Sequence, residues 1–155
     1  MRSLCWLVAG VTLLGGRPLE AQRPLTVTGV RGLTFGAVFP GVARVITRTD
    51  AANSGRFDLR GPRRRQVRLT FTLPVAMTGP GGAQMPITFG SSDAGYSASQ
   101  SIGSQVGFDP RQPFTATLAN NGRGSVFVGG TARPVTNQRA GSYTATLVLT
   151  VMLLP

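Results

Sequence analysis

The chain has 155 residues, with 16 Lys or Arg against 5 Asp or Glu, a formal net charge of +11, and no His. Every basic residue is Arg, and the single Cys is Cys5. These absences exclude Ser–His and Cys–His nucleophile pairs, Schiff-base lysines and the common zinc sites. We therefore expect a protein that is not an enzyme and that has no cofactor and no metal site.

The first 21 residues have the features of an export signal. Arg2 precedes an apolar run at residues 4–14, and Gly-Gly-Arg-Pro follows at residues 15–18. The apolar run is shorter than the roughly 20 residues that span a bilayer. We predict cleavage after Ala21, which leaves one domain, residues 22–155, without a transmembrane segment or a Cys. That domain would reach the periplasm, the cell surface or the medium.

The first half of the domain contains short alternating segments separated by turn residues. Each segment predicts a β-strand. The predicted strands are residues 25–28, 33–39, 42–47, 55–61 and 67–73. In the fourth, Phe57 and Leu59 face inward. Pro40-Gly41 and Pro74 end the second and fifth strands.

The second half continues this pattern and ends in the longest predicted strand. Gly79 to Gly82 is a turn, and residues 90–105, rich in Ser, Gly and Ala, predict a long surface loop. Asn120-Asn121-Gly122 predicts a hairpin turn, and Gly129-Gly130 predicts a bulge or tight bend. The predicted strands here are residues 85–89, 114–119, 125–128, 131–135 and 141–154.

No segment of the domain has helical periodicity, and turn signals recur about every ten residues. Such a pattern is typical of an antiparallel sandwich of two sheets. The fold class we predict is therefore all-β, an immunoglobulin-like antiparallel β-sandwich preceded by a signal peptide.

Three segments in this order carry a resemblance to a known family: LTFG at residues 33–36, VFVGGT at 126–131 and AGSYTATLVLTV at 140–151. Together they resemble small secreted bacterial domains known only as a domain of unknown function, a family similar to spore-coat-U-type and fimbrial pilin domains. The resemblance covers nearly all of residues 22–155. It implies a pilin-like sandwich in the envelope or at the cell surface. For the better understood relatives it implies assembly of like subunits into fibres by donor-strand exchange.

Donor-strand exchange would require a donor segment and an acceptor strand. The candidate donor is residues 22–32, and the candidate acceptor is the last predicted strand. The donor side chains would be Leu25, Val27 and Val30, and the acceptor side chains Leu147, Leu149 and Val151. Arg31 has the same parity as Leu25 and Val27, which weakens the donor.

The alternative is a self-complete sandwich in which residues 25–28 form the first strand. Such a domain must protect its edge strands from pairing with other chains. The charged outward row Arg56, Asp58, Arg60 and Arg68 would supply that protection.

A second functional hypothesis starts from the basic turn Arg63-Arg64-Arg65, with Arg60 and Arg68 nearby. This cluster would attract an anionic polysaccharide or the envelope surface, or it is a solvated turn. Nucleic acid is not an expected partner, because no aromatic residues are interleaved with the arginines for base stacking. The domain's only carboxylate side chains are Asp50, Asp58, Asp93 and Asp109, and turn chemistry or Arg pairing explains all four.

Overall fold

A computed structural model describes residues 23–155 of the chain. The predicted signal peptide and its cleavage site lie outside the described residues. Twelve strands and one short 3₁₀ turn, Pro80–Gly82 (η1), make up the regular structure of the described part, and every strand pair is antiparallel. The predicted all-β class and antiparallel sandwich are confirmed.

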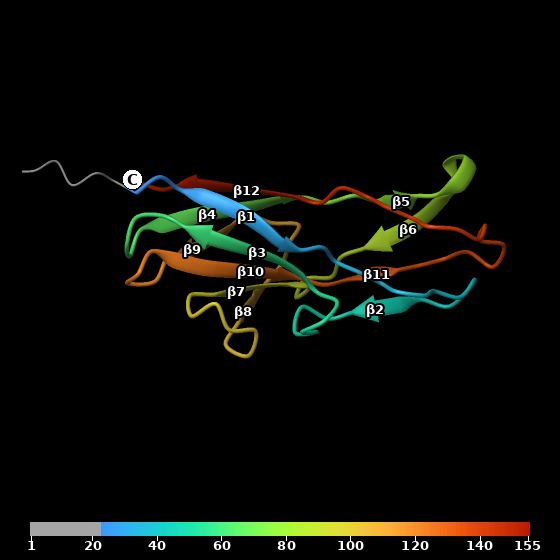
Figure 1. Cartoon of the computed structure of the whole chain (residues 1–155), viewed down its shortest axis with the longest axis horizontal. Coiled ribbons are helices and arrows are strands. Elements are labelled where there is room, and N and C mark those ends of the chain that lie inside the picture. The colour runs from blue at the N-terminus through green and yellow to red at the C-terminus, as the bar shows by residue number, and fades with distance from the viewer. Residues whose placement is uncertain (1–22) are drawn as a thin grey trace, which may run out of the picture.

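The strands form three sheets (Figure 1). The largest has the order β1-β3-β10-β7-β8, with bounds Thr26–Arg31, Gly55–Arg60, Arg123–Val128, Ala94–Ser97 and Val106–Phe108. The second has the order β2-β11-β6-β5, with bounds Arg44–Ile46, Gly130–Ala132, Gln84–Thr88 and Ala76–Thr78. The third has the order β12-β4-β9, with bounds Val148–Leu153, Gln66–Thr72 and Phe114–Thr117.

The molecule is elongated, and its two halves have separate cores (Figure 1). In one half, Leu59 of the largest sheet and Leu69 of the three-stranded sheet belong to the same buried cluster, the first core. In the other half, Ile46, Met85 and Ile87 belong to the second core. Phe57 and Phe71 pack against both cores, with ring centroids 6.2 Å apart, and so join them.

Gly129 lets one strand serve both halves. β10 ends at Val128 and β11 starts at Gly130, so the chain passes from the largest sheet to the second sheet at this residue. A Cβ atom on Gly129 would lie 2.3 Å from the Ile46 carbonyl oxygen, which leaves room only for glycine. At the predicted bulge or tight bend, Gly129-Gly130, the structure has an interruption of regular pairing where the chain changes sheet.

The strands in which apolar and polar residues alternate cleanly lie where the sequence predicts them. One strand of small residues was not predicted. β3 and β4 occupy the predicted segments, with Phe57 half-buried and Leu59 fully buried. The predicted loop at residues 90–105 is wrong in part, because β7 lies within it and all four residues of β7 are buried. β7 has the sequence Ala-Gly-Tyr-Ser, which has little apolar surface. Other segments approach its backbone closely, and a Cβ on Gly95 would lie 2.8 Å from Arg48 Cδ.

Two predicted strands are extended segments without regular pairing. Residues 33–39 contain no strand, and the last strand begins at Val148 rather than at residue 141. A single bridge between Thr78 and Thr144 is the pairing found within residues 141–147. Alternation alone predicts extended backbone, but a strand also requires a neighbour of matching length.

Two predicted pairings are also wrong. The turn at residues 120–122 is present, with Gly122 at φ +75°, but it joins β9 and β10, which lie in different sheets and do not form a hairpin. The charged row does not protect an edge, because β3, with Arg56, Asp58 and Arg60, and β4, with Arg68, are internal strands. The outer strands of these two sheets are β1, β8, β9 and β12.

Candidate functional site: an open groove along one side

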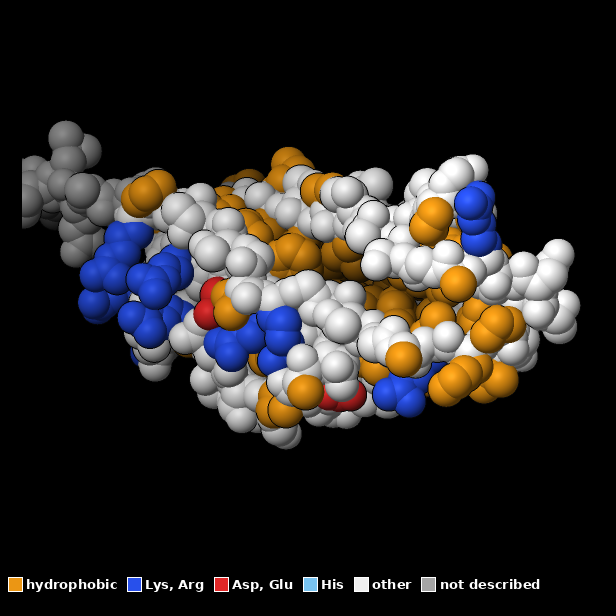
Figure 2. All heavy atoms as spheres, turned by 45° about the vertical axis from the view of Figure 1, so that its right-hand side comes forward, with side chains coloured by type: hydrophobic (Ala, Val, Ile, Leu, Met, Phe, Trp, Pro, Cys, Tyr) orange, Lys and Arg blue, Asp and Glu red, His pale blue; other side chains and the backbone are white. Residues whose placement is uncertain are grey.

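A groove of about 860 Å³ runs along one side of the second core. Figure 2 shows apolar side chains exposed in this groove. Two extended segments form its walls, residues 29–38 and residues 141–147. The apolar side chains that reach its floor are Met77, Met85, Ile87, Phe89 and Val128.

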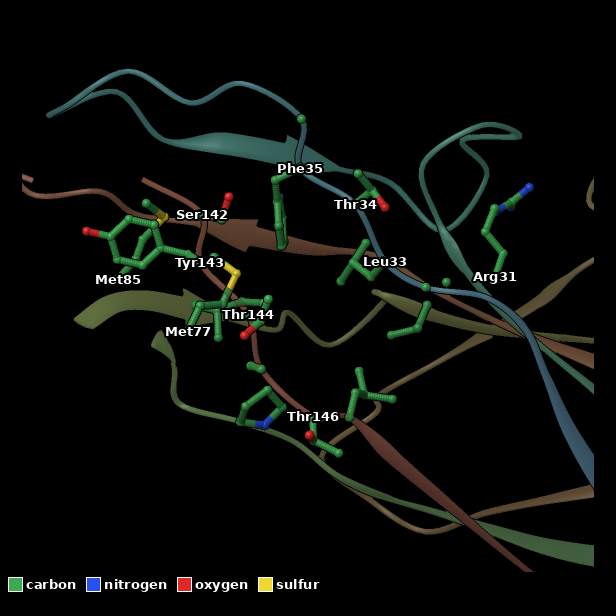
Figure 3. Close-up of a pocket in the computed structure, with 18 of the residues that line it drawn as sticks. Arg31, Leu33, Thr34, Phe35, Met77, Met85, Ser142, Tyr143, Thr144 and Thr146 are labelled. Atoms are coloured by element: carbon green, nitrogen blue, oxygen red, sulfur yellow. The ribbon is translucent and has the colours of Figure 1, made fainter. Parts of the chain in front are cut away.

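The first wall directs apolar side chains into the groove. Figure 3 shows the Leu33 and Phe35 side chains directed toward the space that Met77 and the second wall also line. Phe35 is buried, and Leu33 packs against the second core. Gly36 has φ +64°, a conformation that favours glycine and turns the chain after these two side chains.

A β-bulge turns the Arg31 side chain toward the outer face, although Arg31 is among the residues that line the groove. The register between β1 and β3 shifts between Gly29 and Arg31, so Arg31 lies opposite Arg56 on the outer face. The expectation that Arg31 shares a face with Leu25 and Val27 is therefore wrong, because the extra residue of the bulge reverses the alternation.

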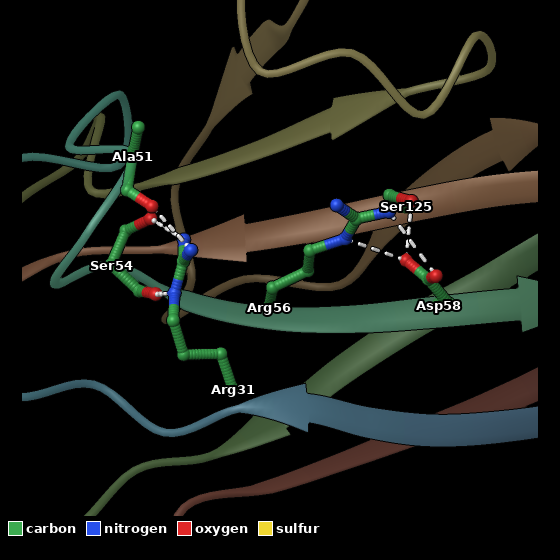
Figure 4. A network of polar contacts seen from close by, with 6 residues as sticks. All are labelled: Arg31, Ala51, Ser54, Arg56, Asp58 and Ser125. Atoms are coloured by element: carbon green, nitrogen blue, oxygen red, sulfur yellow. Dashed lines mark hydrogen bonds and ion pairs between the residues drawn. The ribbon is translucent and has the colours of Figure 1, made fainter.

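Arg31 holds the bulge to the loop before β3 (Figure 4). Its Nε donates to the Ser54 carbonyl oxygen at 2.7 Å and its Nη2 to Ser54 Oγ at 2.9 Å. Its Nη1 donates to the Ala51 carbonyl oxygen. These three bonds fix the start of the first wall.

Tyr143 anchors the second wall. Its hydroxyl donates to the Arg139 carbonyl oxygen at 2.6 Å and accepts from Gln138 Nε2 at 2.7 Å. Its ring lies directly over Gly79, where a Cβ would come within 2.5 Å of the ring. Tyr143 therefore has a packing role at a corner of the fold, and its ring also lines the groove.

The walls carry backbone groups without backbone partners. Within residues 23–155, neither the amides nor the carbonyls of residues 35–38 and 145–147 make a backbone–backbone hydrogen bond. Most of these residues are exposed to solvent. Extended backbone with free donors and acceptors is a template for pairing with another strand.

The predicted donor side chains lie in or beside β1. β1 pairs with β3 of its own chain, and Leu25 packs against the first core. β1 is nevertheless weakly covered, with Val27 39% and Val30 53% exposed.

The predicted acceptor side chains divide between the groove and the first core. Leu147 lines the groove, whereas Leu149 and Val151 belong to or pack against the first core. β12 has β4 as its single strand neighbour, so one of its edges is free in the described structure.

The predicted anion-binding arginines do not form one surface. Arg60 extends from the outer face of the largest sheet, and Arg68 from the outer face of the three-stranded sheet. The turn residues Arg63, Arg64 and Arg65 lie between them and are exposed. Arg123, which the sequence did not single out, is the cross-strand neighbour of Arg60.

Arg64 and Arg65 also have structural partners at this end of the molecule. Arg64 Nε donates to Asn120 Oδ1 at 2.6 Å, and Arg65 Nη2 donates to the Leu154 carbonyl oxygen at 2.9 Å. We call the group of Arg60, Arg63, Arg64, Arg65 and Arg123 the basic end.

Each of the four carboxylates has a local partner. Asp50 and Asp93 accept hydrogen bonds from backbone amides of their turns, and Asp109 pairs with Arg111. Burial alone would raise the pKa of Asp58, but hydrogen bonds from Arg56 and Ser125 leave that pKa below its ordinary value (Figure 4). No group of three or more His, Cys, Asp or Glu side chains that could hold a metal occurs in residues 23–155.

Most of the chain matches a known family model. The family model described as "Domain of unknown function (DUF4402)" matches residues 26–152. The chain belongs to this family. No curated protein sequence matches the chain. The DUF4402 match extends from β1 through nearly all of β12, so both walls of the groove are part of the domain itself.

No helix in the described part of this DUF4402 domain is long and apolar enough to cross a bilayer. Sequence reasoning missed the floor of the groove and the first wall as a site. The signal that could have located the wall is Leu33-Thr34-Phe35-Gly36. These residues combine an apolar alternation with a glycine that ends it.

Proposed function

We propose that this protein is an exported, non-enzymatic structural or assembly subunit of the bacterial cell envelope, with pilin-like assembly. In this proposal an extended segment of a second copy enters the groove and completes the sandwich, which is a form of β-augmentation. The observation that carries the proposal is the combination of an apolar floor with two walls whose backbone groups lack backbone partners.

The dimensions of the groove suit a β-strand. The second wall, residues 142–147, contains no residue with positive φ, and six extended residues span roughly 20 Å at about 3.3 Å per residue. An inserted strand would place alternate side chains against Met77 and Ile87 of the floor. Its backbone would meet the free amides and carbonyls of the walls, so both apolar burial and hydrogen bonding would favour insertion.

The proposed donor is residues 22–32 of a neighbouring copy, with Leu25, Val27 and Val30 as the inserted side chains. Because β1 pairs with β3 of its own chain, donation requires β1 to leave that position. Five of its six residues are exposed, so leaving loses little apolar burial within β1, but it breaks the β1–β3 pairing and the hydrogen bonds of Arg31. The vacated edge of β3 then joins the groove, since Gly29, Val30 and Arg31 of β1 line it.

The test compares oligomers of the wild-type protein with those of a groove variant and a matched control. Leu147→Arg places a charge in the groove, whereas Val148→Arg places one on the exposed outer face one residue later. We expect a heat-sensitive ladder on unheated detergent gels for the wild type and V148R, and its loss in L147R. Ala145→Asp, at an exposed residue of the groove wall, serves as a second groove variant that leaves the core intact.

A wild-type protein that stays monomeric at high concentration would overturn the proposal. A ladder that persists in both L147R and A145D would reject the groove as the acceptor. A synthetic peptide of residues 22–32 provides the direct measurement, because it should bind the wild type and V148R but not L147R.

A second candidate function is a secreted binding module for anionic polysaccharide. The observation that favours it is the adjacency of Arg60 and Arg123 beside the exposed turn Arg63 to Arg65. The two candidates use different surfaces, because no residue of the basic end lines the groove. They can therefore be tested independently.

A further inference from the structure

An exposed apolar surface lies at the end of the molecule opposite the C-terminus. Figure 1 shows the backbone of this end, where the turn before β2 lies. We propose that this surface docks onto an anionic lipid membrane interface. We call it the apolar tip, and it consists of Phe39, Pro40, Val42, Val45 and Val135. It takes no part in the groove, since none of these residues lines it.

The tip combines an exposed Phe with three exposed valines. Phe39 is 70% exposed, Val42 and Val45 are each 58% exposed, and Val135 is 47% exposed. Every other Phe in residues 23–155 is buried or half-buried. Figure 2 shows apolar side chains gathered at this end. Contiguous exposed apolar surface on a folded domain marks an interaction site.

Hydrogen bonds hold the turn of the tip in one conformation. The tip therefore differs from a loose loop, which could fold its apolar side chains inward. The Val42 amide donates to the Phe39 carbonyl oxygen at 3.1 Å, and Gly41 has φ +74°. With Pro40 in the second position, these features define a type II turn. The Gly41 amide also points to the carbonyl oxygens of Pro134 and Val135, at 3.2 and 3.1 Å. The turn therefore holds Phe39 and Val42 in solvent beside Val135.

The charged residues in the segments that form the tip indicate which partner it would bind. No Asp or Glu occurs in residues 36–47 or 131–142, the two segments that form the tip, whereas Arg44, Arg133 and Arg139 do. Arg side chains bind phosphate oxygens bidentately, and apolar side chains beside them can enter the headgroup and acyl boundary. A projecting apolar turn with arginines in its flanking segments and no carboxylates there fits an anionic lipid surface. At such a surface, apolar insertion and the attraction of Arg to phosphate act together.

The test is cosedimentation of the full chain with vesicles of phosphatidylglycerol and phosphatidylcholine, compared with vesicles of phosphatidylcholine alone. We expect binding to the anionic vesicles that weakens with salt. The double variant Phe39→Ser with Val42→Ser should lower that binding about tenfold, because it removes most of the inserted apolar surface. Val75→Ser, at an 85% exposed valine outside the tip, should leave it unchanged. All variants share residues 1–22, so any contribution of that segment is common to them.

A fluorescent reporter locates the contact directly. The chain has one Trp, at residue 6. In a Trp6→Phe background, Phe39→Trp creates a single tryptophan at the tip, and its emission should shift to the blue when anionic vesicles are added. An unshifted emission, equal binding of F39S/V42S and V75S, or a tip-dependent dimer without vesicle binding would each overturn the proposal.

Discussion

Tyr96, in β7, is a buried residue whose ionisation is linked to folding. Its ring belongs to the first core, with 6% of its surface exposed, and its hydroxyl donates to the Thr117 carbonyl oxygen at 2.7 Å. Burial raises the pKa of Tyr96 to about 12. The hydroxyl lies against Gly124, where a Cβ would come within 2.6 Å of it. The site accepts the neutral phenol and disfavours the phenolate.

We predict that the protein loses stability in alkaline solution because of this residue. Above pH 10 the unfolded chain releases the Tyr96 proton while the folded chain retains it, so the unfolded state gains stability as the pH rises toward 12. Two pKa units correspond to about 2–3 kcal/mol in the free energy of unfolding. Urea unfolding between pH 8 and pH 12 measures the loss. Tyr96→Phe should reduce the slope, whereas an equally steep slope in that variant would contradict the prediction.

At the scale of the secondary-structure elements, the bulge at the end of β1 determines which side chains of the first wall face the groove. Arg31 makes three hydrogen bonds to the loop at Ala51 and Ser54, two of them to backbone carbonyls. We predict that Arg31→Ala releases the wall and speeds amide hydrogen exchange in residues 29–34, which include the amides paired with β3 and with Asn53. Each lost bond contributes about 1 kcal/mol to local stability. Hydrogen exchange followed by mass spectrometry measures the change.

The control for this prediction is Arg60→Ala, which removes an exposed arginine opposite Thr26, at the other end of β1. Exchange in residues 29–34 should stay at the wild-type rate in R60A. Arg31→Lys should give an intermediate rate, because one ammonium group does not reproduce the geometry of the guanidinium. Equal exchange in R31A and the wild type would mean that the β1–β3 pairing alone holds the wall.

The same element shows what the sequence can and cannot predict. Alternation located β3 and β4 because each has strand neighbours on both sides and therefore buries alternate side chains. It failed at Arg31, since a bulge changes parity without leaving a mark in the residue types. It failed at β7, because small residues there allow close approach by other segments. The groove exists because, in the described structure, the two walls have no strand paired between them. The sequence of either wall does not show that such a strand is absent.

At the scale of the whole molecule, three surfaces with different chemistry lie along one elongated sandwich. The basic end lies near the C-terminus, the apolar tip lies at the opposite end, and the groove runs along the side of the second core (Figures 1 and 2). The turn spacing predicted the sandwich, and the runs of arginine predicted part of the basic end. Arg123 was missed because it approaches Arg60 only through the pairing of β10 with β3.

The basic end allows a test that separates a binding site from net charge. Replacing Arg63, Arg64 and Arg65 with Ser should lower the salt concentration at which the protein leaves a sulfated polysaccharide resin. The reason is that clustered cations give a stronger local potential than dispersed ones. The charge-matched control replaces Arg68, Arg133 and Arg139, which are exposed and lie on other parts of the molecule. Because it removes the same three charges, an equal shift in both variants would attribute retention to net charge. A larger shift in the turn variant, with Arg60→Ser and Arg123→Ser extending it, would locate the anion at this end and leave assembly through the groove unaffected.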